Sequence, residues 1–137
     1  MDSINIEEKL VLPAEMDSLS QVEKLIDSQA QMLNMNDEVY GKYMLSVVEC
    51  VNNAIVHGCK LDKNKHVTIT YFIDTEHITI SVEDEGSGFD PDSLPDPTLE
   101  VNLEKECGRG VFLMKHLSDD LDFENGGRKV TMTFNLK

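Results

Sequence analysis

The chain has 137 residues, 40% hydrophobic and 28% charged, a composition typical of one globular domain with its own core. Its 26 Asp and Glu residues against 12 Lys and Arg give a formal net charge of −14. Nucleic-acid backbones and anionic membranes bind clustered Lys and Arg, so this balance disfavours both as direct partners. A phosphate-bearing ligand must therefore be held by backbone amides, a metal ion or a few placed side chains.

Three cysteines, Cys50, Cys59 and Cys107, form no CxxC pair and leave one over, which favours a reducing cytoplasm over a disulfide framework. The first ten residues, MDSINIEEKL, lack the basic and apolar segments of a secretory signal. No stretch approaches the ~18 consecutive apolar residues of a membrane-spanning helix. We therefore expect a single cytoplasmic domain over residues 1–137.

The first elements are a strand and a helix. Residues 4–12 predict the strand, which Pro13 closes. Asp17 or Ser18 is suited to cap a helix that runs to about Asn34. The apolar spacing of this helix gives it one periodic face, formed by Leu19, Val22, Leu25, Ile26, Gln29 and Met32.

A second helix is expected to begin at residue 36 or 37 and to run to His57, where Gly58 is suited to end it. Two alternating segments follow, HVTITYFI at residues 66–73 and HITISVED at residues 77–84. Their alternation predicts an antiparallel pair of strands joined through residues 74–76. The inward residues are Val67, Ile69, Tyr71 and Ile73 in the first strand and Ile78, Ile80 and Val82 in the second.

The C-terminal part begins with a segment rich in Gly, Pro, Ser and Asp, and a loop of that length in a small domain is typically functional. We expect a lid or binding loop over about residues 86–107, then a short helix from about Gly108. Strands at residues 121–124 and 129–136 follow, separated by the Asn-Gly-Gly turn at residues 125–127. This order predicts an α+β, two-layer sandwich whose mixed, mostly antiparallel sheet carries helices on one face.

The end of the second predicted helix, ECVNNAIVHG at residues 49–58, carries polar side chains at steps of four. On an α-helix Glu49, Asn53 and His57 project from nearly one line, because each such step advances by about 40°. The Asn53 oxygen suits a Mg²⁺ ion that bridges phosphates, and Glu49 is then placed to act as a general base. The alternative is a helix whose polar side chains only meet solvent, with His57 near the negative end of the dipole.

The strand at residues 77–84 ends in a carboxylate within the sequence VEDEGSGFD. Asp84 has the parity of the strand's apolar residues, and an inward charge is costly unless a donor meets it. The exocyclic amine of a purine is one such donor. Gly86 and Gly88 would then let a flat ring approach the backbone closely. The alternative is an ordinary turn at the end of a strand.

The third motif is GRGVFLMK at residues 108–115, where Gly-x-Gly opens a predicted helix. Unpaired backbone N–H groups and the positive end of the helix dipole make such a start an anion site that needs few basic side chains. Arg109, between Gly108 and Gly110, would add a charge-assisted contact to a terminal phosphate. The alternative is a plain helix start with a flexible lead-in.

In this order the three motifs resemble the GHKL superfamily of ATP-binding proteins, whose Bergerat fold is shared by gyrase, MutL and histidine kinases. ECVNNAIVHG is similar to its N box, DEGSGF to its G1 box and GRGVFLMK to its G2 box. The likeness covers roughly residues 4–136. It is strongest to the anti-sigma factor serine kinases, whose E-x-x-x-N-A-x-x-H-G pattern is matched residue for residue.

The resemblance implies binding of ATP and Mg²⁺, with Asn53 on the metal and Asp84 on adenine. It implies that Glu49 is the catalytic base for transfer of the γ-phosphate to a serine. The phosphorylated protein would be an anti-anti-sigma partner of the STAS type, and the same chain would sequester a sigma factor as a homodimer. Further ATP contacts are implied for His57, Gly86, Gly88, Gly108, Arg109, Gly110, Val111 and, through an adenine-side hydroxyl, Thr131.

One segment departs from the resemblance. The last strand begins GGRKVTMTF, with Arg128 and Lys129 where related sequences often have Gly-Thr-Thr before the Val. Two alternatives stand beside the kinase interpretation. One is a non-catalytic module that binds a partner in a nucleotide-dependent manner, against which the presence of Glu49 argues. The other is a stand-alone ATPase domain of the histidine-kinase type, which the lack of an upstream phosphoacceptor helix disfavours.

Overall fold

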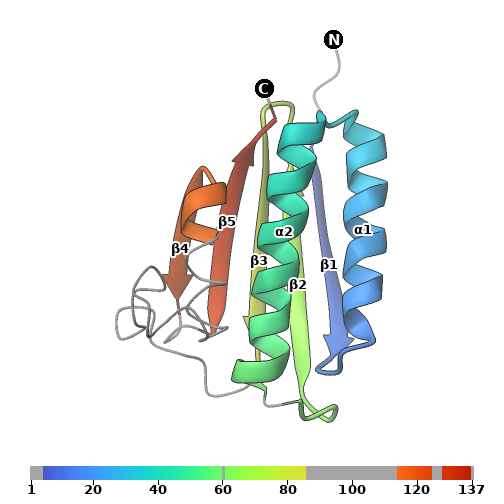
Figure 1. Cartoon of the computed structure of the whole chain (residues 1–137), viewed down its shortest axis with the longest axis vertical. Coiled ribbons are helices and arrows are strands. Elements are labelled where there is room, and N and C mark those ends of the chain that lie inside the picture. The colour runs from blue at the N-terminus through green and yellow to red at the C-terminus, as the bar shows by residue number, and fades with distance from the viewer. Residues whose placement is uncertain (1–4, 60, 86–113, 125–127, 137) are drawn as a thin grey trace, which may run out of the picture.

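The computed structural model of the chain describes residues 5–59, 61–85, 114–124 and 128–136 (Figure 1). In these parts of the chain two long helices lie over one face of a five-stranded sheet, as the α+β sandwich predicts, and residues 114–117 form a further short helix. In chain order the elements are β1 (Ile6–Pro13), α1 (Ser18–Leu33), α2 (Asp37–Asn53), the π-helical turn η1 (Ala54–Gly58), β2 (His66–Ile73), β3 (His77–Asp84), β4 (Asp120–Glu124) and β5 (Lys129–Asn135).

The sheet has the order β1-β2-β3-β5-β4, and all four described pairings are antiparallel. The predicted hairpin of β2 and β3 is confirmed, with Val67 opposite Asp84 and Ile73 opposite Ile78. The largest change from chain order is the insertion of β5 between β3 and β4. It brings the start of β5 beside the end of β3, the place where Asp84 lies.

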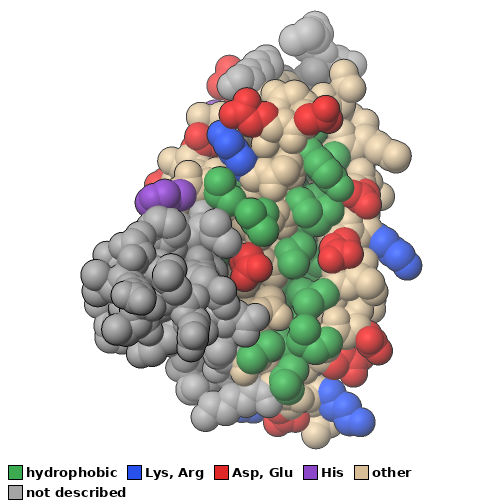
Figure 2. Space-filling view, viewed as in Figure 1, with side chains coloured by type: hydrophobic (Ala, Val, Ile, Leu, Met, Phe, Trp, Pro, Cys, Tyr) green, Lys and Arg blue, Asp and Glu red, His purple; other side chains and the backbone are tan. Residues whose placement is uncertain are grey.

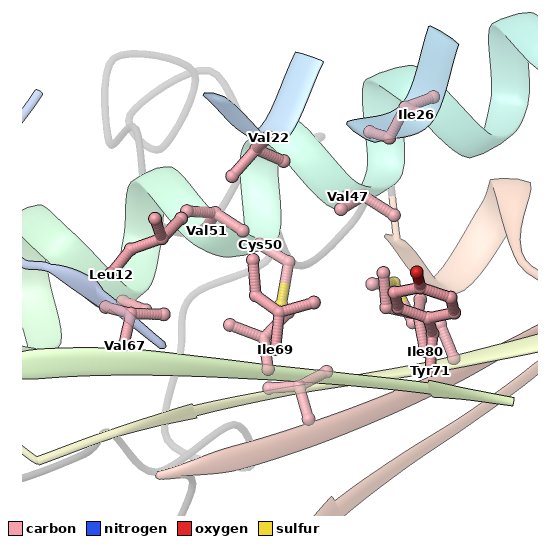
Figure 3. Close-up of a cluster of buried hydrophobic side chains, with 14 of the residues drawn as sticks. Leu12, Val22, Ile26, Val47, Cys50, Val51, Val67, Ile69, Tyr71 and Ile80 are labelled. Carbon is pink, nitrogen blue, oxygen red and sulfur yellow. The ribbon is translucent and has the colours of Figure 1, made fainter. Parts of the chain in front are cut away.

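The core lies between the helices and the sheet (Figure 3). The alternation predicted for β2 and β3 is confirmed, because the inward residues of both strands are buried, and β5 alternates in the same way. The ring of Tyr43 on α2 packs edge-on against Phe134 on β5, with ring centroids 5.2 Å apart. Val22 of α1 and Val51 of α2 pack onto the sheet, to which β1 contributes the buried Leu12.

The start of α1 differs from the sequence expectation. Asp17 has helical backbone angles and makes no side-chain cap, while Ser18 is the first helical residue and donates its hydroxyl to the Pro13 carbonyl. The helix ends as expected at Asn34, which adopts a left-handed conformation with φ 49°. Met32, predicted for the buried face, is 53% exposed, so the apolar face of α1 is narrower than its spacing indicates.

The second helix begins as predicted and ends differently. Asn36 caps it by accepting a hydrogen bond of 2.8 Å from the Val39 amide. The α-helix stops at Asn53, and one π turn, Ala54–Gly58, completes the path to the predicted end. In that turn the amide of Cys59 donates to the carbonyl of Ala54 over 2.8 Å. A single π turn inside a helix is frequently found at a functional site.

No helix in the described parts of the chain is both long and apolar enough to cross a membrane.

Candidate nucleotide site

A narrow recess lies between the end of α2 and the sheet. It comprises about 220 Å³ of empty space including its mouth, and its walls stand too close together to admit a water molecule. The recess brings together Asn53 and Asp84. These are the residues predicted to bind the metal ion and the adenine of a nucleotide. The lining residues are Cys50, Asn53, Ala54, Val82, Asp84, Met114, Arg128 and Val130.

Asp84 is the last residue of β3 and only 5% of its surface is exposed. The strand alternation puts its carboxylate on the inward face, next to Val82, as its parity predicts. Its backbone amide donates to the Arg128 carbonyl over 2.9 Å, which ties the end of β3 to the start of β5. A carboxylate in such an apolar wall is suited to accept a hydrogen bond from a bound ligand.

Burial raises the pKa of the Cys50 thiol, and the nearby carboxylate of Asp84 raises it further. Cys50 therefore remains a neutral thiol and contributes an apolar wall rather than a nucleophile. Its place in the recess was not predicted from the sequence, although it lies three residues before Asn53 and thus on the same side of the helix.

Asn53 is the last residue of α2 and is 2% exposed. Neither its Oδ1 nor its Nδ2 has a hydrogen-bond partner within the described residues. An unsatisfied buried amide costs about 1–3 kcal/mol, so such groups call for an explanation. A ligand that accepts from Nδ2 or is coordinated by Oδ1 would supply one.

Glu49 lies one helical turn before Asn53 and is partly buried. It is absent from the recess walls. Its catalytic role stays a prediction.

The π turn changes the geometry assumed for His57. The spacing predicts one α-helical line for Glu49, Asn53 and His57, but residues 54–58 are π-helical, so the last step of four is not α-helical. The expectation of an α-helix through His57 is thus wrong for its final turn. The side chain of His57 lies outside the described part of the structure, and its predicted ATP contact is a prediction still.

Thr131 does not reach the recess. It lies on β5 between the inward residues Val130 and Met132, and its hydroxyl is 2.9 Å from that of Ser81 on the open face of the sheet. Its side chain is therefore not a wall of the recess, and its adenine contact stays a prediction. The other predicted ATP contacts lie outside the described residues: Gly86, Gly88, Gly108, Arg109, Gly110 and Val111.

The family of the chain is shown by its similarity to known proteins. Residues 12–134 match the family model described as a histidine kinase-like ATPase domain. The chain belongs to that family. The match spans β1 to β5 and so includes every element that carries the recess.

Similar proteins of known name support this membership of the histidine kinase-like ATPase family. The chain is 26% identical over 132 residues to the serine-protein kinase RsbW of Bacillus subtilis, covering 91% of this chain and 82% of the relative. It is 34% identical over 105 residues to an anti-sigma F factor of Thermoanaerobacter, covering 75% and 73%. Both kinds of relative recur among the other matches from Listeria and Clostridium.

A solved structure supports the fold. The crystal structure of the RsbU and RsbW domains of a Mycobacterium tuberculosis protein matches with a TM-score of 0.66 over 96% of this chain. The match has 14% sequence identity and spans 32% of that longer chain, so it is evidence for the fold alone. The predicted membership of the GHKL superfamily and the predicted α+β fold are confirmed.

Proposed function

We propose that the chain binds Mg-ATP in the recess and acts as a serine protein kinase that phosphorylates an STAS-type anti-anti-sigma protein and sequesters a sigma factor. The observation that carries the proposal is the joint burial in one recess of Asp84 and of Asn53, whose side-chain amide has no hydrogen-bond partner among the described residues. Membership of an ATPase family and the names of the relatives, serine-protein kinase and anti-sigma F factor, support it.

The residues present fit the purine end of ATP. Asp84 offers a buried acceptor for an exocyclic amine, and Val82, Met114 and Val130 offer apolar surface for the ring. Burial of the ring beside these side chains excludes water, which strengthens the hydrogen bond to the carboxylate. Asp84 would thus orient the nucleotide and select adenine over bases that lack this donor.

The residues present also fit Mg²⁺. The ion prefers oxygen ligands and keeps several of its waters while it bridges phosphates, so one neutral protein oxygen is sufficient. The Oδ1 atom of Asn53 is such an oxygen, buried and without a partner among the described residues. When bound, Mg²⁺ would neutralise charge on the phosphates.

Glu49 is the proposed general base. Its carboxylate would take the proton of the partner's serine hydroxyl while the serine oxygen bonds to the γ-phosphorus and the bond to the β,γ-bridging oxygen breaks, releasing ADP. Phosphoryl transfer depends mainly on positioning and charge stabilisation. The spacing of one turn between Glu49 and Asn53 on the same rigid helix supplies that positioning.

The proposal extends to location and assembly. A net charge of −14 disfavours nucleic acid, so regulation of transcription would proceed through protein partners. A homodimer follows from the resemblance to anti-sigma kinases, whereas the cysteine content and the chain length predict a single cytoplasmic domain over residues 1–137. They remain predictions.

The test is transfer of label from [γ-³²P]ATP with Mg²⁺ to serine on candidate STAS-type partners. Glu49→Gln should lower transfer by at least about 100-fold, the usual contribution of a general base, while ATP binding is kept. Glu38→Gln is the matched control, because Glu38 lies on the same helix, pairs with Lys42 and is 78% exposed in its side chain. It should leave transfer unchanged.

Two results would contradict the proposal in different ways. Transfer that survives in Glu49→Gln would remove Glu49 as the base. Tight ATP binding by the wild-type chain with no transfer to any partner would favour the alternative of a non-catalytic, nucleotide-dependent binding module.

A further inference from the structure

The short helix at residues 114–117 is attached to the core by one side chain. It lies on the same face of the sheet as α2 (Figure 1). Met114, its first residue, is 0% exposed, whereas Lys115 and His116 are exposed and Leu117 is half-buried. The helix therefore contributes the Met114 side chain to the interior and little else.

The buried side chain of Met114 closes the nucleotide recess on one side. Met114 is one of the recess walls. The recess has about 220 Å³ of empty space including its mouth, yet its walls stand too close together to admit a water molecule. A purine base is far larger than a water molecule, so a base can enter only if one of the walls moves.

The walls that belong to α2 and the sheet are held in place. Cys50, Asn53 and Ala54 lie on a helical segment whose other inward residues are fully buried. Val82 and Val130 are opposed to each other on β3 and β5, and each of these strands is paired on both sides. A valine side chain is also restricted at χ1 by its branched Cβ. Movement of any of these walls would therefore disturb the core.

Met114, by contrast, can leave the recess at small cost to the rest of the fold. Its side chain is unbranched and has three rotatable bonds, which is why methionine fills irregular gaps. Its helix has no other fully buried side chain, and segments with few buried apolar contacts open most easily. Arg128, another long side chain of the recess, is already exposed. Met114 is thus the wall whose movement disturbs the least buried surface.

We propose that Met114 plugs the recess in the nucleotide-free chain, and that a purine base enters by displacing its side chain to the edge of the ring. Met114 is then an affinity-determining residue. Only molecules with the recess open bind the base, so the apparent affinity falls in proportion to their fraction. The plug rests on the packing of Met114. The displacement rests, in addition, on the proposed nucleotide function of the recess.

The plug is tested without nucleotide by the rate at which iodoacetamide alkylates Cys50, measured by mass spectrometry of the peptide that contains it. Cys50 lies in the recess and is 2% exposed. Met114→Ala should raise this rate at least about tenfold over Met132→Ala, since burial of one methionine side chain corresponds to about that factor. Equal rates in the two variants would overturn the plug.

Met132→Ala is the matched control because Met132 is also 0% exposed but lies on β5 outside the recess. Both variants lose a buried methionine side chain and so a similar amount of stability. Global unfolding then raises both rates alike, and their ratio isolates the opening of the recess. Met114→Val and Met132→Val repeat the comparison with smaller cavities, where the same order of rates is expected, and circular dichroism checks that each variant is folded.

The displacement is tested by equilibrium titration of the full chain with ADP and Mg²⁺. Met114→Ala should bind about tenfold more tightly than the wild-type chain, because binding no longer removes a buried side chain from the recess. Contact of Met114 with the edge of a base recovers only part of that burial. Met132→Ala should bind as the wild type does. Equal or weaker binding by Met114→Ala than by Met132→Ala would overturn the displacement.

The two experiments separate this inference from the proposed function. If ADP binds to neither the wild-type chain nor any variant, the nucleotide function fails and the displacement fails with it. The alkylation rates still decide whether Met114 closes the recess.

Discussion

At the scale of single residues, the site is built from side chains that the fold alone does not need. Asn53 ends α2 with two buried polar atoms that have no partner among the described residues. A small hydrophobic residue would be sufficient where a helix end faces an apolar sheet. Ala54, the residue after Asn53, is such a residue and is buried. The unpaired amide is therefore best explained by a ligand that the recess accommodates.

This explanation predicts a trade of stability against binding. Asn53→Ala should keep or increase the free energy of unfolding, by up to about 1 kcal/mol, because it removes an unsatisfied buried amide. The same variant should bind ATP much more weakly with Mg²⁺ present and show little further loss when EDTA is added. Chemical denaturation and nucleotide titration measure the two effects. A loss of stability above about 2 kcal/mol would show that the amide has a structural partner.

Individual residues were predictable from the sequence to different degrees. The inward carboxylate of Asp84 followed from alternation alone and is confirmed by its burial. Thr131 lies outside the recess because its neighbours on β5, Val130 and Met132, are the inward residues of that strand. Arg128 as a wall of the recess could not be predicted, because its position depends on which strand β5 joins and in what register.

At the scale of elements, α2 is the part of the fold that positions the candidate base and metal ligand. Its start is fixed by the Asn36 cap, with Asp37 and Glu38 in the first turn complementing the helix dipole. The start of α1 has no such cap, since the side chain of Asp17 makes no hydrogen bond to the helix.

The difference gives a matched pair of variants. Asn36→Ala should lower the free energy of unfolding by about 1 kcal/mol, the usual cost of losing a side-chain cap. Asp17→Ala should cost less than about 0.5 kcal/mol, because only a weak dipole interaction is lost. Urea denaturation followed by circular dichroism compares the two. Equal costs would mean that the Asn36 cap does not contribute as its geometry indicates.

Helix periodicity predicted α2 well until Asn53 and failed beyond it. The apolar pattern continues through Ile55 and Val56, so nothing in the residue types marks the change to a π turn. We attribute the π turn to packing, because Ala54 and Ile55 are buried against the sheet. A π turn contains one residue more than an α turn, and the helix ends at this turn.

At the scale of the whole molecule, the element order determined most of the architecture in advance. Alternating strands and two adjacent helices permit few arrangements other than helices on one face of an antiparallel sheet. The placement of β5 between β3 and β4 was not predictable, because antiparallel strands of similar alternation can pair in several orders.

The surface of the helical layer is consistent with protein partners. Figure 2 shows hydrophobic side chains gathered in a band over α1 and α2, with carboxylates on both sides of it. Leu45 of α2 and Met32 of α1 are 42% and 53% exposed. Basic side chains are few on this face.

The central claim, that one recess binds the base and the metal-bound phosphates of ATP, is tested most directly by the affinity of Asp84→Asn for Mg-ATP. We predict that the wild-type chain binds Mg-ATP and that Asp84→Asn binds at least about 30-fold more weakly, the least cost of removing one partner of a buried charged hydrogen bond. Glu83→Gln, one residue away on the open face, should bind as the wild type does. Equal binding by Asp84→Asn and Glu83→Gln would contradict the account.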